Sequence, residues 1–303
     1  MSAADAAQAT TVTKPQAKAK PRKAPRQGQH PLIWLAVILI ILFCLFPFYW
    51  LVNVSLKSGG DLSGSSLYPP HPTLKNYSSI FQNSDFTSGL KNSVIVSFSV
   101  TILALVFGSF AAYALARLKF KRKFLVLGIV LSVTTFPGIA IAAPIFQLWT
   151  NPPFGLPTLY NTIPGLIIPY LTFALPLAIY ILVSFFKEIP KDLEEAALVD
   201  GATHFQAFRK VVVPLAAPGL ATAGILTFIF AWNEFLLAIT LTSSASARTV
   251  PASIAFFTGS TQFEQPLGTI SAASVTISVP LILLVLFFQK RIVAGLTAGA
   301  VKG

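Results

Sequence analysis

Residues 195–202 read Glu195-Ala196-Ala197-Leu198-Val199-Asp200-Gly201-Ala202, and the same polar stretch continues to Pro214. Half of the ten acidic residues of the chain fall within thirteen positions here: Glu188, Asp192, Glu194, Glu195 and Asp200. The whole sequence, by contrast, is 54% hydrophobic. This stretch is therefore the one sizeable polar island in an apolar chain, and the fold is organised around it.

The island has the chemistry of two short helices joined by a tight corner. Acidic residues crowd its first turns, where negative charge complements the helix dipole. Gly201 is placed to end the first helix in a left-handed cap. Thr203 and Gln206 form a capping box that begins the second helix, and Pro214 is expected to close it. We therefore expect a helical hairpin over 188–214.

The regions around the hairpin are apolar enough to cross a membrane. Only 11% of residues are charged, whereas soluble domains carry about a quarter. A spanning helix needs about 20 apolar residues. Five runs contain no Asp, Glu, Lys or Arg, and the longest suffices for two spans: 32–56, 92–116, 124–186, 211–233 and 265–289. The sequence thus predicts an all-α integral membrane protein with six transmembrane helices.

The six predicted spans place the hairpin between spans four and five: 32–55, 92–116, 124–148, 160–186, 215–241 and 268–289. Basic residues concentrate on the cytoplasmic side of membrane proteins. Eighteen of the 22 Lys and Arg residues fall in the two termini, in 117–123 and in 187–210, and the other four lie on the opposite side. Both termini and the hairpin are therefore expected in the cytoplasm.

Residues 1–30 form a separate segment, with six basic residues against the lone Asp5. Such a composition cannot bury a core, so we expect a disordered cytoplasmic leader, followed by a membrane domain over 31–303. The apolar run after it is too long for a signal peptide, which indicates an uncleaved anchor. The basic charge is an orientation signal, and it also suits contact with anionic lipid head groups.

Several kinds of chemistry are not supported by the sequence. It contains no G-x-x-x-x-G-K-[ST] phosphate loop, so the chain is not expected to bind ATP itself. Cys44 is the only cysteine, and the three histidines show no ligand spacing, so neither a disulfide nor a metal site is expected. The net charge of +12 invites a nucleic-acid interpretation. However, the acidic first helix of the hairpin would repel phosphate.

The hairpin resembles a known loop through these residues: Glu195-Ala196-Ala197, Asp200-Gly201-Ala202, Phe208, Val213-Pro214-Leu215 and Pro218. Position by position they are similar to the EAA loop of permeases from binding-protein-dependent ABC importers. In that family the loop is a pair of coupling helices seated in a groove of a cytoplasmic ATPase, and the counterpart of Glu195 pairs with an arginine-bearing pocket. The implied docking residues are Glu195, Ala196, Ala197, Asp200, Gly201, Phe205 and Phe208.

A second set of residues narrows the resemblance: Trp232-Asn233-Glu234-Phe235, Phe257-Thr258-Gly259-Ser260 with Gln262-Phe263-Glu264, and Arg291-Ile292-Val293-Ala294-Gly295-Leu296. These resemble the second permease of carbohydrate importers and, in the carboxyl half, the permeases of trehalose importers from mycobacteria and relatives. The resemblance implies a non-catalytic subunit in a bacterial inner membrane, importing a disaccharide such as trehalose. The implied partners are a second homologous permease, two ATPase subunits that carry ATP and Mg, an extracytoplasmic sugar-binding protein and membrane lipid, with no nucleic acid.

Glu234 is the one acid inside a predicted span, where an ionisable group costs roughly 2.5–3.5 kcal/mol. One interpretation is that Asn233 and Glu234 line the translocation path and that Trp232 stacks on a sugar ring. The other is that these residues tie neighbouring helices together. In the predicted outer loop before the last span, Gln262 and Glu264 are candidate contacts for the binding protein.

Two other classes of membrane protein stay open. A proton-coupled secondary transporter could use Glu234 as its proton site, although it would not need the EAA hairpin. A membrane-embedded enzyme would need a polar catalytic cluster at membrane depth, and only one acid lies there. The hairpin itself has the alternative of being a solvated connection between two spans.

Overall fold

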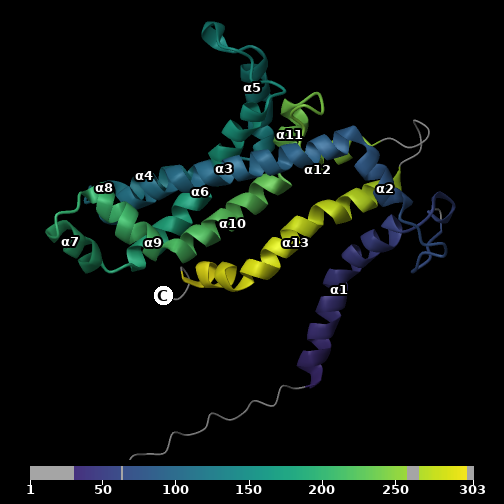
Figure 1. Ribbon diagram of the computed structural model, residues 1–303, viewed down its shortest axis with the longest axis horizontal. Coiled ribbons are helices and arrows are strands. Elements are labelled where there is room, and N and C mark those ends of the chain that lie inside the picture. The colour runs from purple at the N-terminus through teal and green to yellow at the C-terminus, as the bar shows by residue number, and fades with distance from the viewer. Residues whose placement is uncertain (1–30, 63, 258–265, 299–303) are drawn as a thin grey trace, which may run out of the picture. The chain divides into compact units, whose positions relative to one another are not determined.

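The computed structural model describes residues 31–62, 64–257 and 266–298, and every regular element in these ranges is a helix (Figure 1). The prediction of an all-α protein is therefore confirmed. The chain divides into two units, Met1–Phe46 and Pro47–Gly303. The first contains the beginning of α1 (Pro31–Ser55), whose side chains over 31–46 are all exposed within this chain. A helix that is apolar all round is suited to lipid or to another membrane helix.

Three long helices form the core of the second unit: α3 (Ser84–Arg117), α6 (Ile163–Glu188) and α10 (Ala217–Asn233), which run side by side (Figure 1). Small residues lie where α3 and α6 meet. A Cβ atom added to Gly108 would lie only 3.3 Å from the Cβ of Ala178. Small residues let membrane helices approach closely, so α3 and α6 provide a tightly packed frame for the hairpin.

Four helices are long and apolar enough to cross a membrane: α1, α3, α6 and the Leu267–Gln289 part of α13 (Leu267–Ala298). Two further helix pairs pass the same test only when joined, and they are bent by 89° and 76°. Counting each bent pair as one span gives up to six among the described residues. The chain is therefore a multi-pass membrane protein, and the number six stays a prediction.

The third predicted span, 124–148, is not one continuous helix. It consists of α4 (Lys123–Ser132) with η2 (Val133–Thr135), then α5 (Gly138–Thr150) at 89° to them. Phe136 and Pro137, between these parts, have extended backbone angles. Proline lacks an N–H and disfavours the helical conformation of the residue before it, which explains the position of the break.

The fifth predicted span, 215–241, is also interrupted. After α10 ends at Asn233, Glu234 and Phe235 leave the helical conformation, and α11 (Leu236–Leu241) begins. No proline or glycine lies at this break. The Glu234 carboxylate instead accepts hydrogen bonds from the first amides of α11, at 2.9 Å from Leu237 N and 3.1 Å from Ala238 N. These bonds stabilise a new helix start within the predicted span.

Short elements connect the long helices: η1 (Gly59–Asp61), α2 (Lys75–Gln82), η3 (Pro153–Gly155) and α12 (Val250–Ile254). Asn161, which has a positive φ of 56°, lies two residues before α6 and contacts the segment that follows α11. Its Oδ1 accepts hydrogen bonds from Ser243 N at 3.0 Å and Ser244 N at 3.1 Å. The start of α6 is thereby fixed to the segment that follows α11.

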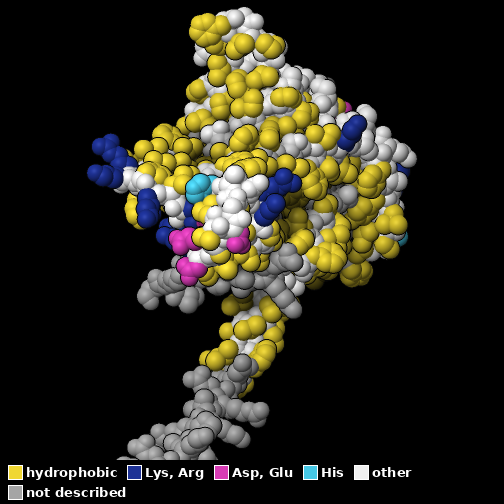
Figure 2. All heavy atoms as spheres, turned by 60° about the vertical axis from the view of Figure 1, so that its left-hand side comes forward, with side chains coloured by type: hydrophobic (Ala, Val, Ile, Leu, Met, Phe, Trp, Pro, Cys, Tyr) yellow, Lys and Arg dark blue, Asp and Glu magenta, His cyan; other side chains and the backbone are white. Residues whose placement is uncertain are grey.

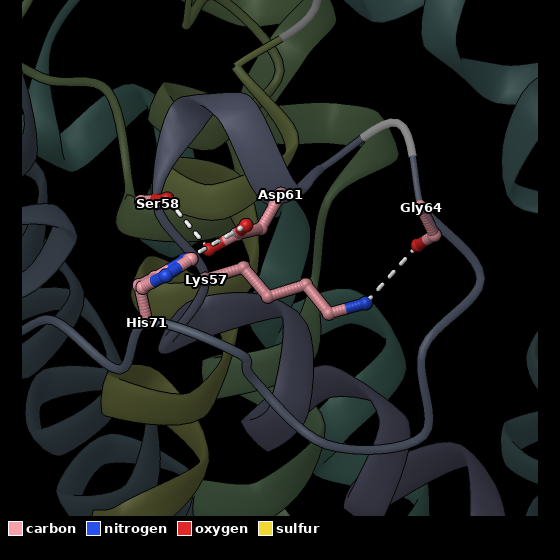
Figure 3. A network of polar contacts seen from close by, with 5 residues as sticks. All are labelled: Lys57, Ser58, Asp61, Gly64 and His71. Carbon is pink, nitrogen blue, oxygen red and sulfur yellow. Dashed lines mark hydrogen bonds and ion pairs between the residues drawn. The ribbon is translucent and has the colours of Figure 1, made fainter.

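The loop between α1 and α2 folds around a buried lysine (Figure 3). Lys57 is 1% exposed, and its Nζ donates to the carbonyl oxygens of Gly64 at 3.2 Å and Ser66 at 3.0 Å. In the same loop, Ser58 Oγ donates to Asp61 Oδ2 at 2.6 Å, and His71 Nδ1 lies 3.3 Å from Asp61 Oδ1. These polar contacts give the loop a defined conformation without regular secondary structure over most of its length.

Candidate functional site

The polar island folds as the predicted helical hairpin. Its first helix, α7 (Lys191–Val199), ends before Gly201, which has a φ of +88°. Its second begins with α8 (His204–Ala207) and the predicted capping box. Thr203 Oγ1 accepts from Gln206 N at 3.2 Å, and Gln206 Oε1 accepts from Thr203 N at 2.8 Å. Both capping predictions are confirmed.

The second helix ends at Leu215, one residue after Pro214, which the sequence predicted would close it. The helix continues from α8 through a π-helical turn, η4 (Phe208–Val212), and through α9 (Val213–Leu215), which contains Pro214. The chain then turns by 76° from His204–Leu215 into α10.

Aromatic packing attaches this second helix to the long helices. Phe208 is 6% exposed, and its ring centroid lies 4.9 Å from that of Tyr113 and 6.3 Å from that of Phe186. Tyr113 belongs to α3 and Phe186 to α6. Of the residues expected to dock a partner, Phe208 is therefore placed inside this chain, whereas Phe205 is 58% exposed.

A buried ion pair attaches the first helix. Arg117 Nε lies 3.1 Å from Glu194 Oε2, and the two side chains are only 5% and 10% exposed. The Tyr113 hydroxyl donates to Glu194 Oε1, and Arg117 Nη2 donates to the carbonyl oxygen of Ile189 at 2.9 Å. The end of α3 thus holds α7 by the ion pair and the Tyr113 hydrogen bond, and it holds Ile189, two residues before α7, by a charge-assisted hydrogen bond. Charge-assisted hydrogen bonds are about twice as strong as neutral ones.

Sequence reasoning missed Glu194 and selected its neighbour Glu195. Consecutive residues on a helix point about 100° apart, so one of the two acids faces α3 while Glu195 is exposed. The signal that could have identified Glu194 is Arg117, the first basic residue after the uncharged run 92–116.

The free face of the hairpin combines charged and apolar side chains. Figure 2 brings the end of the molecule that carries α7 and α8 forward and shows acidic, basic and hydrophobic side chains together there. Val199 is 87% exposed and Leu193 46%. The exposed members of the predicted docking set are Glu195, Ala196, Asp200, Gly201 and Phe205, and Ala197 is half-buried. Exposed apolar groups with charges around them are typical of a protein-interaction surface.

The predicted path residues Trp232, Asn233 and Glu234 lie in different environments. Trp232 is 2% exposed, and its Nε1 donates to the carbonyl oxygen of Ile277 in α13 at 3.2 Å. It therefore packs between helices rather than presenting a ring to a solute. Asn233 is exposed and donates to the Ile229 carbonyl at 2.8 Å. The predicted contacts Gln262 and Glu264 lie outside the described residues.

Glu234 borders a cavity of about 230 Å³. The cavity is lined by Thr134, Phe136, Gly138, Phe173, Phe230, Glu234 and Leu237. Two other cavities, of about 240 and 310 Å³, are lined almost wholly by apolar side chains. Of these three, only the Glu234 cavity has a carboxylate in its wall.

The sequence profile of the family described as "Binding-protein-dependent transport system inner membrane component" matches residues 104–297. The chain belongs to this family. A related protein, the trehalose transport system permease protein SugB of Mycobacterium tuberculosis (strain CDC 1551 / Oshkosh), is 52% identical over 265 residues, which cover 88% of this chain and 95% of that protein. The trehalose/maltose transport system permease protein MalG of Thermococcus litoralis is 40% identical, with 90% and 96% covered.

The fold is also found in solved transporters. A bacterial ABC transporter that imports the acidic polysaccharide alginate aligns with a TM-score of 0.72 at 23% identity, covering 88% of this chain and 98% of the aligned one. Family and fold together show that the chain is a non-catalytic, multi-pass permease component of an ABC transporter in the inner membrane. The alternative of a proton-coupled secondary transporter finds no support in these matches.

Proposed function

We propose that the chain is one of two permease subunits of an ATP-driven importer for a disaccharide, with trehalose as the first candidate. The observation that carries this proposal is the 52% identity to the trehalose permease SugB over 95% of its length. The sulfoquinovosyl glycerol permease SmoH of Agrobacterium fabrum is 42% identical. Because glycosides of different structure are transported by relatives at this lower level, the higher identity is what favours trehalose.

The proposed complex contains a second homologous permease, two ATPase subunits with ATP and Mg, and an extracytoplasmic sugar-binding protein. The need for separate ATPases follows from the missing phosphate loop. The binding protein has a parallel in the related fold of the alginate transporter in complex with an alginate-loaded periplasmic protein, which aligns with a TM-score of 0.64. Gln262 and Glu264 remain the proposed contacts for such a protein.

The proposed ATPase dock is the free face of α7 with the corner after it. Glu195, Ala196 and Gly201 are exposed there, and a carboxylate next to small residues allows an arginine of a partner to approach closely. The proposed orientation places this face and both termini in the cytoplasm, because most of the basic residues lie in those segments.

Reconstitution of the complex tests this function. The chain is co-purified with its partner permease, ATPase and binding protein, and uptake of labelled disaccharides into proteoliposomes is measured with internal or external ATP. We expect trehalose uptake that needs the binding protein and ATP on the side of the hairpin. Uptake without ATP that follows an imposed proton gradient would contradict the proposal, and selective uptake of another sugar would contradict trehalose alone.

A further inference from the structure

The breaks in the third and fifth predicted spans meet at the same place. The first break contributes Phe136 and the start of α5 at Gly138, and the second contributes Glu234 and the start of α11. A Cβ atom added to Gly138 would lie 3.7 Å from Leu236 Cδ2, so the two half-helices are in contact at their beginnings. Both breaks border the cavity of about 230 Å³.

Breaks in membrane helices often mark places where a polar solute or water can be bound. Non-helical backbone at membrane depth is tolerated where it is buried in protein or lines a cavity. Many secondary transporters place substrates at such interruptions near the middle of the membrane, and the same physical reason applies to any transmembrane path for a polar solute. Pro137 lies midway along the predicted span 124–148, which puts this cavity at an intermediate depth.

The wall of the cavity combines flat apolar faces with one acceptor group. Phe136, Phe173 and Phe230 contribute rings, and the centroids of Phe173 and Phe230 are 6.4 Å apart. Each oxygen of Glu234 accepts one backbone hydrogen bond. The hydroxyl of the buried Tyr170 also interacts with this carboxylate. A carboxylate has about four acceptor sites, so at least one remains for a hydroxyl donor of a ligand. Thr134 adds a hydroxyl.

The geometry points to a carbohydrate subsite on this chain, in which a sugar ring lies against the Phe136 and Phe230 rings and donates hydroxyl hydrogen bonds to Glu234. The carboxylate charge is already stabilised by two amide donors, so the subsite suits a neutral polyhydroxylated ligand rather than a cation. The inference rests on the proposed function, and it names residues of this chain that the sugar contacts during its passage.

The cavity is large enough for only part of the substrate. Cavities that enclose whole drug-sized ligands measure about 300–1,000 Å³, and this one measures about 230 Å³. It therefore receives one ring of a disaccharide, and the other ring lies outside it. Because the sugar is only partly enclosed, it can be released from the cavity during transport.

Phe136 is the most informative residue for a test, because it is 61% exposed and its truncation removes little packing. In the reconstituted importer, Phe136→Ala should lower disaccharide uptake by about five- to tenfold, while ATP hydrolysis stimulated by the loaded binding protein is retained. Phe136→Tyr, which keeps the ring, should retain at least half of the uptake.

The matched control is Phe98→Ala. Phe98 is 54% exposed and lines the apolar cavity of about 240 Å³, so its truncation should leave uptake unchanged. Normal uptake by Phe136→Ala, or an equal loss in Phe98→Ala, would overturn the subsite while leaving the importer function intact. An unaltered complex that imports no disaccharide would overturn the proposed function and the subsite with it.

A second measurement does not depend on transport rates. In a Cys44→Ser background, Phe136→Cys provides a single thiol in the cavity, because Cys44 is the only cysteine of the chain. In the assembled importer with ATP, disaccharide-loaded binding protein should slow labelling of this thiol compared with sugar-free binding protein. Labelling at equal rates under the two conditions would count against a sugar in the cavity.

Discussion

Arg117 Nε lies 3.1 Å from Glu194 Oε2, where the end of α3 meets the first helix of the hairpin. The same arginine donates to the carbonyl of Ile189, and Tyr113 donates to the other oxygen of Glu194. A force applied to the free face of α7 is therefore passed to α3 through a pair that solvent barely reaches. This relationship connects the proposed docking surface to the membrane helices within one chain.

Glu194→Gln should destabilise the protein far more than Glu195→Gln. Removing one charge of a buried pair costs about 3–5 kcal/mol because the other charge stays buried, whereas an exposed substitution usually changes stability by less than about 0.5 kcal/mol. Thermal unfolding of the purified complex in detergent measures both variants. Equal unfolding temperatures for the two would show that the Arg117 contact contributes nothing.

Glu195→Ala, unlike Glu194→Gln, should affect ATPase binding and not stability. Because Glu195 is exposed and Glu194 is not, its removal is expected to leave unfolding unchanged and to reduce binding of the ATPase subunit by roughly 2–5 kcal/mol, as for one half of an interfacial charge pair. The affinity of the isolated ATPase for the permease pair, measured by biolayer interferometry, tests this prediction. Undiminished affinity would remove Glu195 from the dock.

Gly201 should tolerate side chains according to their backbone preference rather than their size. Nothing lies within 4 Å of a Cβ added there, but its φ is +88°, a conformation that costs non-glycine residues about 1–2 kcal/mol. We expect Gly201→Asn to be the mildest change and Gly201→Val the most harmful to unfolding temperature and coupled ATP hydrolysis. Gly128→Ala is the control, since Gly128 lies in α4 with equally open space and no positive φ.

Local chemistry in the sequence was sufficient to predict the hairpin, because its caps depend on neighbours a few residues apart. Gly201, Thr203 and Gln206 behave as their types suggest. The role of Glu194 could not be read in the same way, since its partner Arg117 belongs to another helix. Which of two adjacent acids is buried is decided by how α7 packs on α3, and no local pattern contains that information.

The helix breaks also show which features local sequence predicts and which depend on contacts it does not reveal. Pro137 coincides with a break, but Pro144, Pro169 and Pro176 lie inside continuous helices, so proline alone does not locate an interruption in a membrane helix. The break at Glu234 has no proline or glycine, and it follows from a side-chain carboxylate that caps α11. Sequence reasoning identified Glu234 as unusual and left its role open between path and structure.

The Asp61 contacts predict a pH-dependent loop. The hydrogen bond from Ser58, together with the hydrogen bonds and charge of His71, lowers the pKa of Asp61 below its ordinary value. A depressed carboxyl pKa adds stability that is present above the ordinary value and is lost as pH falls through the lowered one. Ser58→Ala and His71→Ala should therefore each shift loosening of the loop to higher pH, which hydrogen exchange of residues 57–62 measures. An unchanged pH of loosening in both variants would contradict this prediction.

Replacing Glu234 should separate its role as the cap of α11 from its proposed role as a hydrogen-bond acceptor for the sugar. Glu234→Gln keeps one acceptor oxygen and loses the charge, whereas Glu234→Ala leaves the amides of Leu237 and Ala238 without the acceptors they have now. A hydrogen bond to a charged group contributes about 1.5–3 kcal/mol, so the alanine variant should unfold at a lower temperature than the glutamine variant. In the reconstituted importer, uptake by Glu234→Gln should fall but stay dependent on ATP and insensitive to a proton gradient. If that variant lost a gradient-driven component that the unaltered protein possesses, Glu234 would be a proton site instead of a helix cap and sugar acceptor.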